Sequence, residues 1–123
     1  MKKCGKIKQE ELYARKSIDY KIKRVCNEIK NTKKESVLTN QLVRSGTSVG
    51  ANIREAKYAH SKADFITKLQ ISLKECYETE YWIEIAQKAN IITDDMAKSV
   101  LHDCGAIRRM LIASVNTAKG NSK

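Results

Sequence analysis

Apolar residues recur at intervals of three and four along most of this chain, which is the period of an amphipathic α-helix. Four such stretches are present, over about residues 7–30, 36–58, 62–89 and 93–117. Short polar segments at 31–35, 58–61 and 90–92 separate them and are predicted to be turns. Four helices with short connections predict an all-α, antiparallel up-down four-helix bundle.

The second stretch is rich in small residues, and the segment from Leu42 to Ala56 contains both Gly46 and Gly50. Each glycine costs about 1 kcal/mol relative to alanine within a helix, so this helix depends on its neighbours for stability. Small side chains also let another backbone approach closely. We therefore place this helix at the centre of the bundle. Its predicted core stripe, with Gly46 in the middle, is Leu38, Leu42, Val49, Ile53 and Ala56.

The other three stretches also have one apolar face each. The predicted core positions are Ile7, Ala14, Ile18, Ile22, Val25 and Ile29 in the first; Phe65, Leu69, Ser72, Cys76 and Ile83 in the third; and Met96, Val100, Cys104, Ile107, Leu111 and Val115 in the fourth. Ser36, Ser61 and Thr93 are suited to cap the helices that follow them. Asp64 completes a capping-box pattern with Ser61.

A second apolar line on the third stretch lies well away from its core stripe. Ile71, Trp82 and Ile85 form this line, with Tyr81 beside it. One bundle core cannot bury both lines, and exposed apolar patches mark partner surfaces, so self-association is the simplest explanation. Two alternatives are a different helical phase and a Trp82 side chain that covers a loop.

Two charged residues of the second stretch, Arg44 and Glu55, project about 160° and 140° away from its core stripe. This position favours contacts with another subunit over chemistry. The predicted oligomer interface comprises Arg44, Glu55, Ile71, Glu78, Trp82 and Ile85.

The formal charge of this 123-residue chain is +10, and it is unevenly distributed. Residues 1–35 hold 12 Lys/Arg against 5 Asp/Glu, a net charge of +7, whereas residues 36–123 contribute only +3. The length indicates one domain over 1–123, with a basic tail at 1–6 and a polar tail at 118–123. A basic excess in one arm favours a polyanionic partner such as nucleic acid or an anionic membrane surface. Simple solubility is the alternative.

Basic and aromatic residues alternate along the face of the first stretch that lies opposite its core. Cationic groups can meet phosphates, and tyrosine rings can stack on bases, so this basic stripe predicts a nucleic-acid contact. Its members are Tyr13, Lys16, Tyr20, Lys23, Arg24, Lys30 and Lys34. The alternative is an ordinary solvated face whose tyrosines pack against a neighbouring subunit.

Neither a catalytic set nor a metal site can be assembled from sequence spacing. The two histidines, His60 and His102, lack the Glu-x-x-His pattern of a di-iron bundle. The Gly46–Gly50 segment lacks the Lys of a phosphate loop. The four cysteines are too widely spaced for a zinc motif. We expect a protein without enzymatic activity, metal or cofactor, in which Glu80 is a satisfied acid at the core edge.

The expected compartment is the cytoplasm. No apolar run approaches the roughly 20 residues that a membrane span needs, and no apolar block follows the N-terminal lysines as in a signal peptide. Three of the four cysteines fall on apolar faces, which fits a reducing environment.

The chain resembles a family of bacterial four-helix-bundle proteins that includes proteins encoded by intervening sequences within 23S ribosomal RNA genes. The resemblance rests on Gln41–Ala56 (QLVRSGTSVGANIREA) and on three later segments, Ala63–Phe65 (ADF), Ser72–Glu75 (SLKE) and Glu78–Trp82 (ETEYW). It extends in register over about Val37–Thr117.

The same fold occurs in the accessory variability determinant of diversity-generating retroelements. The resemblance implies a basic homopentameric barrel that binds nucleic acid and a reverse transcriptase and has no catalysis of its own. The basic stripe and this resemblance together predict a homo-oligomeric accessory protein that binds RNA or DNA. The resemblance alone implies a reverse transcriptase as a further partner. The alternative is a protein-interaction scaffold whose basic face docks an acidic partner.

Overall fold

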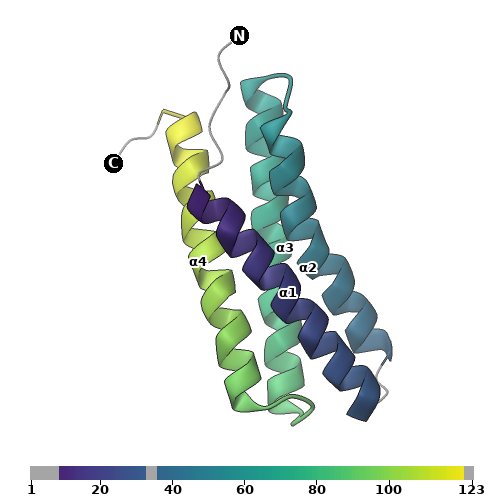
Figure 1. The fold of residues 1–123 in the computed structure, drawn as a ribbon. Coiled ribbons are helices and arrows are strands. Elements are labelled where there is room, and N and C mark those ends of the chain that lie inside the picture. Colours follow the sequence, from purple (N-terminus) through teal and green to yellow (C-terminus); the bar gives the residue numbers. More distant parts are fainter. Residues whose placement is uncertain (1–8, 33–35, 121–123) are drawn as a thin grey trace.

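The computed structural model describes residues 9–32 and 36–120, which form four α-helices joined by short turns. The helices are α1 (Gln9–Thr32), α2 (Ser36–Lys57), α3 (Lys62–Lys88) and α4 (Asp94–Ala118). Successive helices run in opposite directions along one bundle (Figure 1). The predicted all-α up-down architecture is confirmed. No helix of the described residues is both long enough and apolar enough to cross a membrane.

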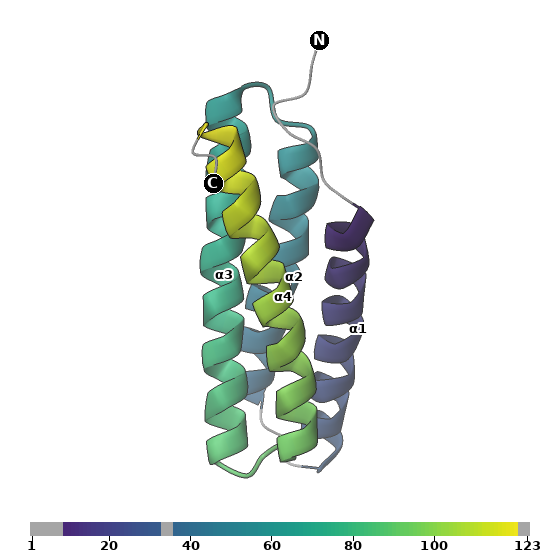
Figure 2. The same cartoon turned by 90° about the vertical axis from the view of Figure 1, so that its left-hand side faces the viewer.

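The four helices form a ring in which each packs against its two neighbours. α1 contacts α2 and α4, and α3 contacts the same two helices on the other side. α1 and α3 therefore lie on opposite sides of the bundle, with α2 and α4 between them (Figure 2). The most extensive contact is between α2 and α3. The outer face of α1 is thus far from the outer face of α3.

The core occupies the centre of this ring and follows the predicted stripes. The predicted core positions of α2 and α3 are all buried, including Gly46 and Ser72. Those of α4 are buried except for Met96, which is half-buried against the core. In α1, Ile18, Ile22, Val25 and Ile29 are buried, whereas Ile7 and the side chain of Ala14 lie outside the described part of the chain.

Gly46 of α2 lies directly against the side chain of Ile22 in α1. A Cβ atom placed there would lie 3.1 Å from Cγ1 and 3.2 Å from Cγ2 of Ile22, which is tighter than an ordinary van der Waals contact. The glycine that weakens α2 as an isolated helix therefore makes room for the α1 core stripe. This explains why a poor helix former stands at the middle of α2. The prediction that α2 lies at the centre of the bundle is wrong, because each of the four helices packs against two neighbours around a shared core.

Buried hydroxyl groups join α2 to α3 within the apolar core. Ser72 donates a hydrogen bond to the Val49 carbonyl oxygen at 2.8 Å. Thr79 donates to Ser45 Oγ at 3.0 Å, and Ser45 donates in turn to the carbonyl oxygen of Gln41 at 2.9 Å. Since an unsatisfied buried hydroxyl costs about 1–3 kcal/mol, these pairings help to fix the register of the two helices.

The helix ends confirm most of the local predictions. The side chains of Ser61 and Thr93 accept hydrogen bonds from the backbone N–H groups of Asp64 and Met96, as N-caps do. The Asp64 carboxylate accepts from the backbone N–H of His60 at 3.4 Å, one residue earlier than in a regular capping box.

The C-terminus of α3 has a feature that the sequence reading missed. Asn90 has a φ of 59°, and the backbone N–H groups of Asn90 and Ile91 donate to the carbonyls of Gln87 and Ala86. This pattern is a Schellman motif, in which Asn takes the left-handed position usually held by Gly.

Several helix boundaries differ from the prediction by one or two residues, including the ends of α2 at Lys57 and of α3 at Lys88. α1 continues to Thr32, so Asn31 and Thr32 are helical and not part of a turn. Ser36 is the first residue of α2 and not the cap before it, and Ala118 still belongs to α4. Helix termini vary by one or two residues under most definitions, so these shifts leave the architecture unchanged.

Candidate functional site

The described part of the basic stripe lies on the outer face of α1. Tyr20 is 65% exposed, and Lys23 and Arg24 are also exposed. The Arg24 guanidinium carbon lies 6.0 Å from the centroid of the Tyr20 ring, at the outer limit of a cation–π contact. These residues point away from Ile18, Ile22 and the rest of the α1 core stripe.

Lys23 and Arg24 differ from the neighbouring Lys21 in their ion pairs. Lys21 lies at the α1–α4 seam and forms an ion pair with Asp103 at 3.0 Å. Within the described residues, neither Lys23 nor Arg24 has a carboxylate within ion-pair distance. Their charges are therefore available to an external anion.

The remaining members of the stripe cannot be placed in the same way. Lys34 lies outside the described residues. Tyr13, Lys16 and Lys30 belong to α1, but their side chains are outside the described set. The structure thus brings together Tyr20, Lys23 and Arg24, while the assignment of the other four stays a prediction.

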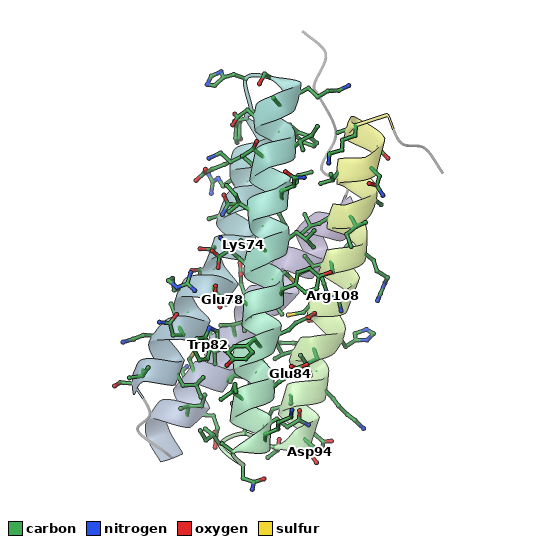
Figure 3. The ribbon with its side chains drawn as sticks, turned by 180° about the vertical axis from the view of Figure 1, so that it is seen from behind. Lys74, Glu78, Trp82, Glu84, Asp94 and Arg108 are labelled. Carbon is green, nitrogen blue, oxygen red and sulfur yellow. The ribbon has the colours of Figure 1, made fainter. Side chains whose placement is uncertain are left out.

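The charged residues of the predicted interface, Arg44, Glu55 and Glu78, form ion pairs within the chain. Arg44 of α2 donates to the carboxylates of both Glu75, at 3.2 Å, and Glu78 of α3. Glu78 also accepts a hydrogen bond from Trp82 Nε1 at 3.1 Å, and Figure 3 shows both side chains on α3. The hydrogen bond from Arg44 has the largest effect and, together with the one from Trp82, lowers the pKa of Glu78 below its usual value. Glu55 is similarly paired, with Lys68 at 2.8 Å.

The second apolar line of α3 is partly exposed to solvent. Ile71 and Ile85 are 38% and 39% exposed, and Tyr81 is exposed beside them. Trp82 is half-buried and packs against the core, with its ring edge-to-face with Tyr81 at a centroid distance of 5.1 Å. The helical phase used in the prediction is therefore correct, and Trp82 covers the core and not a loop. The role of this face in subunit contact stays a prediction, as does that of the paired Arg44 and Glu55.

Two buried cysteines and a carboxylate meet at the α3–α4 seam, which sequence spacing did not suggest. The ligand atoms of Cys76, Glu80 and Cys104 all lie within 4.8 Å of one another. Both thiols are buried, and the Cys76 thiol contacts the backbone carbonyl of Cys104 at 3.4 Å. The contact with Cys76 and the burial raise the pKa of the Cys104 thiol far above its usual value.

The carboxylate of this cluster has a basic partner. Arg108 of α4 donates from Nε to Glu80 Oε2 at 2.8 Å, and Figure 3 shows Arg108 between the two helices. Glu80 is therefore a satisfied acid at the core edge, as predicted. The signal that could have indicated the cluster is the i, i+4 spacing of Cys76 and Glu80 on one helix, and of Cys104 and Arg108 on the next.

Comparisons with known proteins identify the family. The model of the family described as 23S rRNA-intervening sequence protein matches residues 11–113. The chain belongs to this family. The match spans most of all four helices, so the resemblance, which sequence placed in register over about Val37–Thr117, extends to α1 as well.

A solved structure of a relative has the same fold. It is the crystal structure of a protein with unknown function from Bacteroides thetaiotaomicron, which belongs to the S23 ribosomal protein family. The two chains are 42% identical, with a TM-score of 0.81, and the alignment covers 83% of this chain and 94% of the other. No match was found among curated proteins.

Proposed function

We propose that this family member is a homo-oligomeric accessory protein that binds RNA or DNA through the outer face of α1 and catalyses no reaction. The observation that carries the proposal is the exposed group formed by Tyr20, Lys23 and Arg24, whose two cations have no carboxylate partner in the described structure. This group lies in the segment 1–35 that holds +7 of the net charge of +10.

The chemistry of this face suits a phosphate backbone better than a base sequence. Lysine and arginine heads displace counterions from phosphates, which gives affinity that falls steeply with salt and depends little on sequence. An exposed tyrosine ring can add stacking on an unpaired base, worth about 1–3 kcal/mol. Binding should therefore favour RNA or DNA with single-stranded segments.

Self-association is the second part of the proposal. The outer face of α3, with Ile71, Tyr81 and Ile85 exposed around the half-buried Trp82, supports burial against another copy of the chain. Because α3 lies opposite α1, such an assembly would leave the α1 face accessible on every subunit. The resemblance to the accessory variability determinant favours a pentamer, in which five copies of the basic face would act together.

The same resemblance suggests a reverse transcriptase as a protein partner. An adjacent gene for a reverse transcriptase, and co-purification of the two proteins, would support this part of the proposal. A gene position inside a 23S ribosomal RNA gene would instead contradict the retroelement assignment.

The proposal is tested by titrating a fluorescently labelled structured RNA with the protein and following anisotropy at low salt. The test variant is Lys23→Glu/Arg24→Glu. The matched control, Lys98→Glu/Lys119→Glu, changes net charge equally at exposed positions of α4 and its C-cap, which carry neither the basic stripe nor the exposed apolar line of α3. We expect wild type and control to bind similarly and the test variant to bind at least about tenfold more weakly, from the loss of two phosphate contacts.

Two results would contradict the nucleic-acid proposal. One is the absence of wild-type binding to several unrelated nucleic acids at low salt, which would favour a scaffold that docks an acidic protein. The other is equal weakening in both double variants, which would assign the effect to net charge and not to the α1 face.

A further inference from the structure

The Cys76–Glu80–Cys104 cluster has the donor types and the proximity of a metal site. Two thiol sulfurs and one carboxylate oxygen lie within 4.8 Å of one another. Around a tetrahedral zinc ion, with bonds of about 2.0–2.3 Å, neighbouring ligand atoms lie about 3.5–4 Å apart. Closing the present cluster onto an ion therefore requires movements of about 1 Å, which rotation of three side chains can supply.

The surrounding charges also fit a divalent ion. Without metal, the seam holds the Glu80 carboxylate, the Arg108 guanidinium and two neutral thiols, whose charges sum to zero. If one divalent ion replaces the two thiol protons, which pass to solvent, the sum is again zero. The exchange thus leaves no net charge in a buried site, where an uncompensated charge would be costly.

The carboxylate is already held in a suitable orientation. Arg108 donates to Glu80 Oε2 and thereby holds the carboxylate beside the two thiols. Metal-binding side chains commonly have such an outer hydrogen-bond partner, which fixes their orientation. The side chains of Glu80 and Arg108 are 15% and 30% exposed, so they mark the side from which an ion can enter. Both thiols lie behind them in the core.

We propose that Cys76, Cys104 and Glu80 bind one Zn(II) ion between α3 and α4, with Arg108 orienting the carboxylate. Thiolate ligands select for Zn(II), Cu(I) and iron–sulfur clusters. The hard carboxylate disfavours Cu(I), and an iron–sulfur cluster ordinarily takes four cysteines. A water molecule takes the fourth position of the tetrahedron. The ion joins two helices whose ligands are 24 to 28 residues apart, so it stabilises the α3–α4 seam.

The experiment uses the full-length chain with Cys4→Ser and Cys26→Ser, so that the only thiols left are those of the cluster. Reduced, metal-free protein is titrated with Co(II), which reports thiolate ligation through a charge-transfer band and visible bands. Zn(II) is then added in competition. We expect one Co(II) per chain, displacement by Zn(II), and a higher Tm with Zn(II) than without metal.

Further substitutions in this background test the two cysteine ligands and the orienting arginine. Cys76→Ser and Cys104→Ser should each remove the Co(II) spectrum that two thiolate ligands give. Each should also remove the Zn(II)-dependent rise in Tm. Arg108→Leu should weaken binding by about 10–100-fold while keeping both thiolates in the spectrum. Circular dichroism at each step verifies that the variants remain helical.

A folded, fully reduced protein that shows no cobalt–thiolate band would overturn the proposal. So would a Zn(II)-dependent rise in Tm that persists when both Cys76 and Cys104 are replaced. Thiol titration before each experiment establishes that the pair is reduced. Failure of metal binding would leave the nucleic-acid proposal untouched, because the α1 face shares no residue with this cluster.

Discussion

The contact between Gly46 and Ile22 allows a quantitative test of how α1 and α2 pack together. Replacing Gly46 with alanine improves the helix propensity of α2 by about 1 kcal/mol. The new Cβ would, however, meet two Cγ atoms of Ile22 at 3.1 and 3.2 Å. Overpacking of a filled core typically costs about 1–3 kcal/mol. We therefore expect Gly46→Ala to be neutral to destabilising by about 2 kcal/mol, despite its better helix propensity.

Gly105 provides the matched control, since it is also a buried glycine inside a helix. A Cβ at Gly105 would meet only guanidinium nitrogens of Arg109 at 3.4 Å and Arg108 at 3.6 Å, which are the ends of flexible side chains. Gly105→Ala should therefore retain most of the propensity gain and stabilise the protein by about 0.5–1 kcal/mol. The two substitutions should differ by about 2 kcal/mol.

Urea unfolding followed by circular dichroism measures both free energies, provided that the protein concentration is held constant. A double-mutant cycle with Ile22→Ala isolates the contact, because Gly46→Ala should become stabilising once the Cγ atoms are removed. Equal stabilisation by Gly46→Ala and Gly105→Ala would refute the close α1–α2 approach. So would a Gly46→Ala effect that Ile22→Ala leaves unchanged.

Three further predictions concern the surface. Glu78→Gln should destabilise the protein by about 0.5–1 kcal/mol at neutral pH, the range for a partly exposed ion pair. The folded-state pKa of Glu78 is lowered, so this contribution is present above the unfolded-state value of 4.5 and is lost as the pH falls through the folded-state value. The free energies of unfolding of wild type and variant should therefore converge in acid. A difference that stays constant with pH would contradict this prediction. Tyr20→Ala should weaken binding to single-stranded RNA by about 5-fold or more and leave duplex binding unchanged, as measured by anisotropy; equal loss on both would argue against stacking. Ile71→Glu/Ile85→Glu should shift the mass measured by light scattering toward the monomer without loss of helicity, whereas an unchanged mass would exclude this face as the interface.

Local rules predicted the helices because their causes lie within a few residues. The side chains of Ser61 and Thr93 cap α3 and α4 through backbone groups three residues ahead, which sequence spacing reveals directly. The core stripes follow from the helical period in the same way. The Schellman motif at Asn90 was missed because Gly is the usual signal at that position.

The features that sequence did not predict arise where two helices meet. The helical wheel showed only that Arg44 projects away from its own core stripe. Its partners Glu75 and Glu78 stand more than 30 residues away on α3. Cys76 and Cys104 likewise come together only through the packing of α3 on α4. Periodicity gives the direction in which a side chain leaves its own helix, but not the residue opposite to it.

The central claim, that the outer face of α1 binds a nucleic-acid backbone, is tested most directly by the salt dependence of binding. The association constant of the wild-type protein for a structured RNA is measured by anisotropy over a series of salt concentrations, alongside Lys23→Glu/Arg24→Glu. We predict a linear fall of log K with log salt for the wild type, and a slope shallower by about 0.7–0.9 for each phosphate contact removed in the variant. Binding that does not change with salt, or equal slopes for the two proteins, would contradict the account.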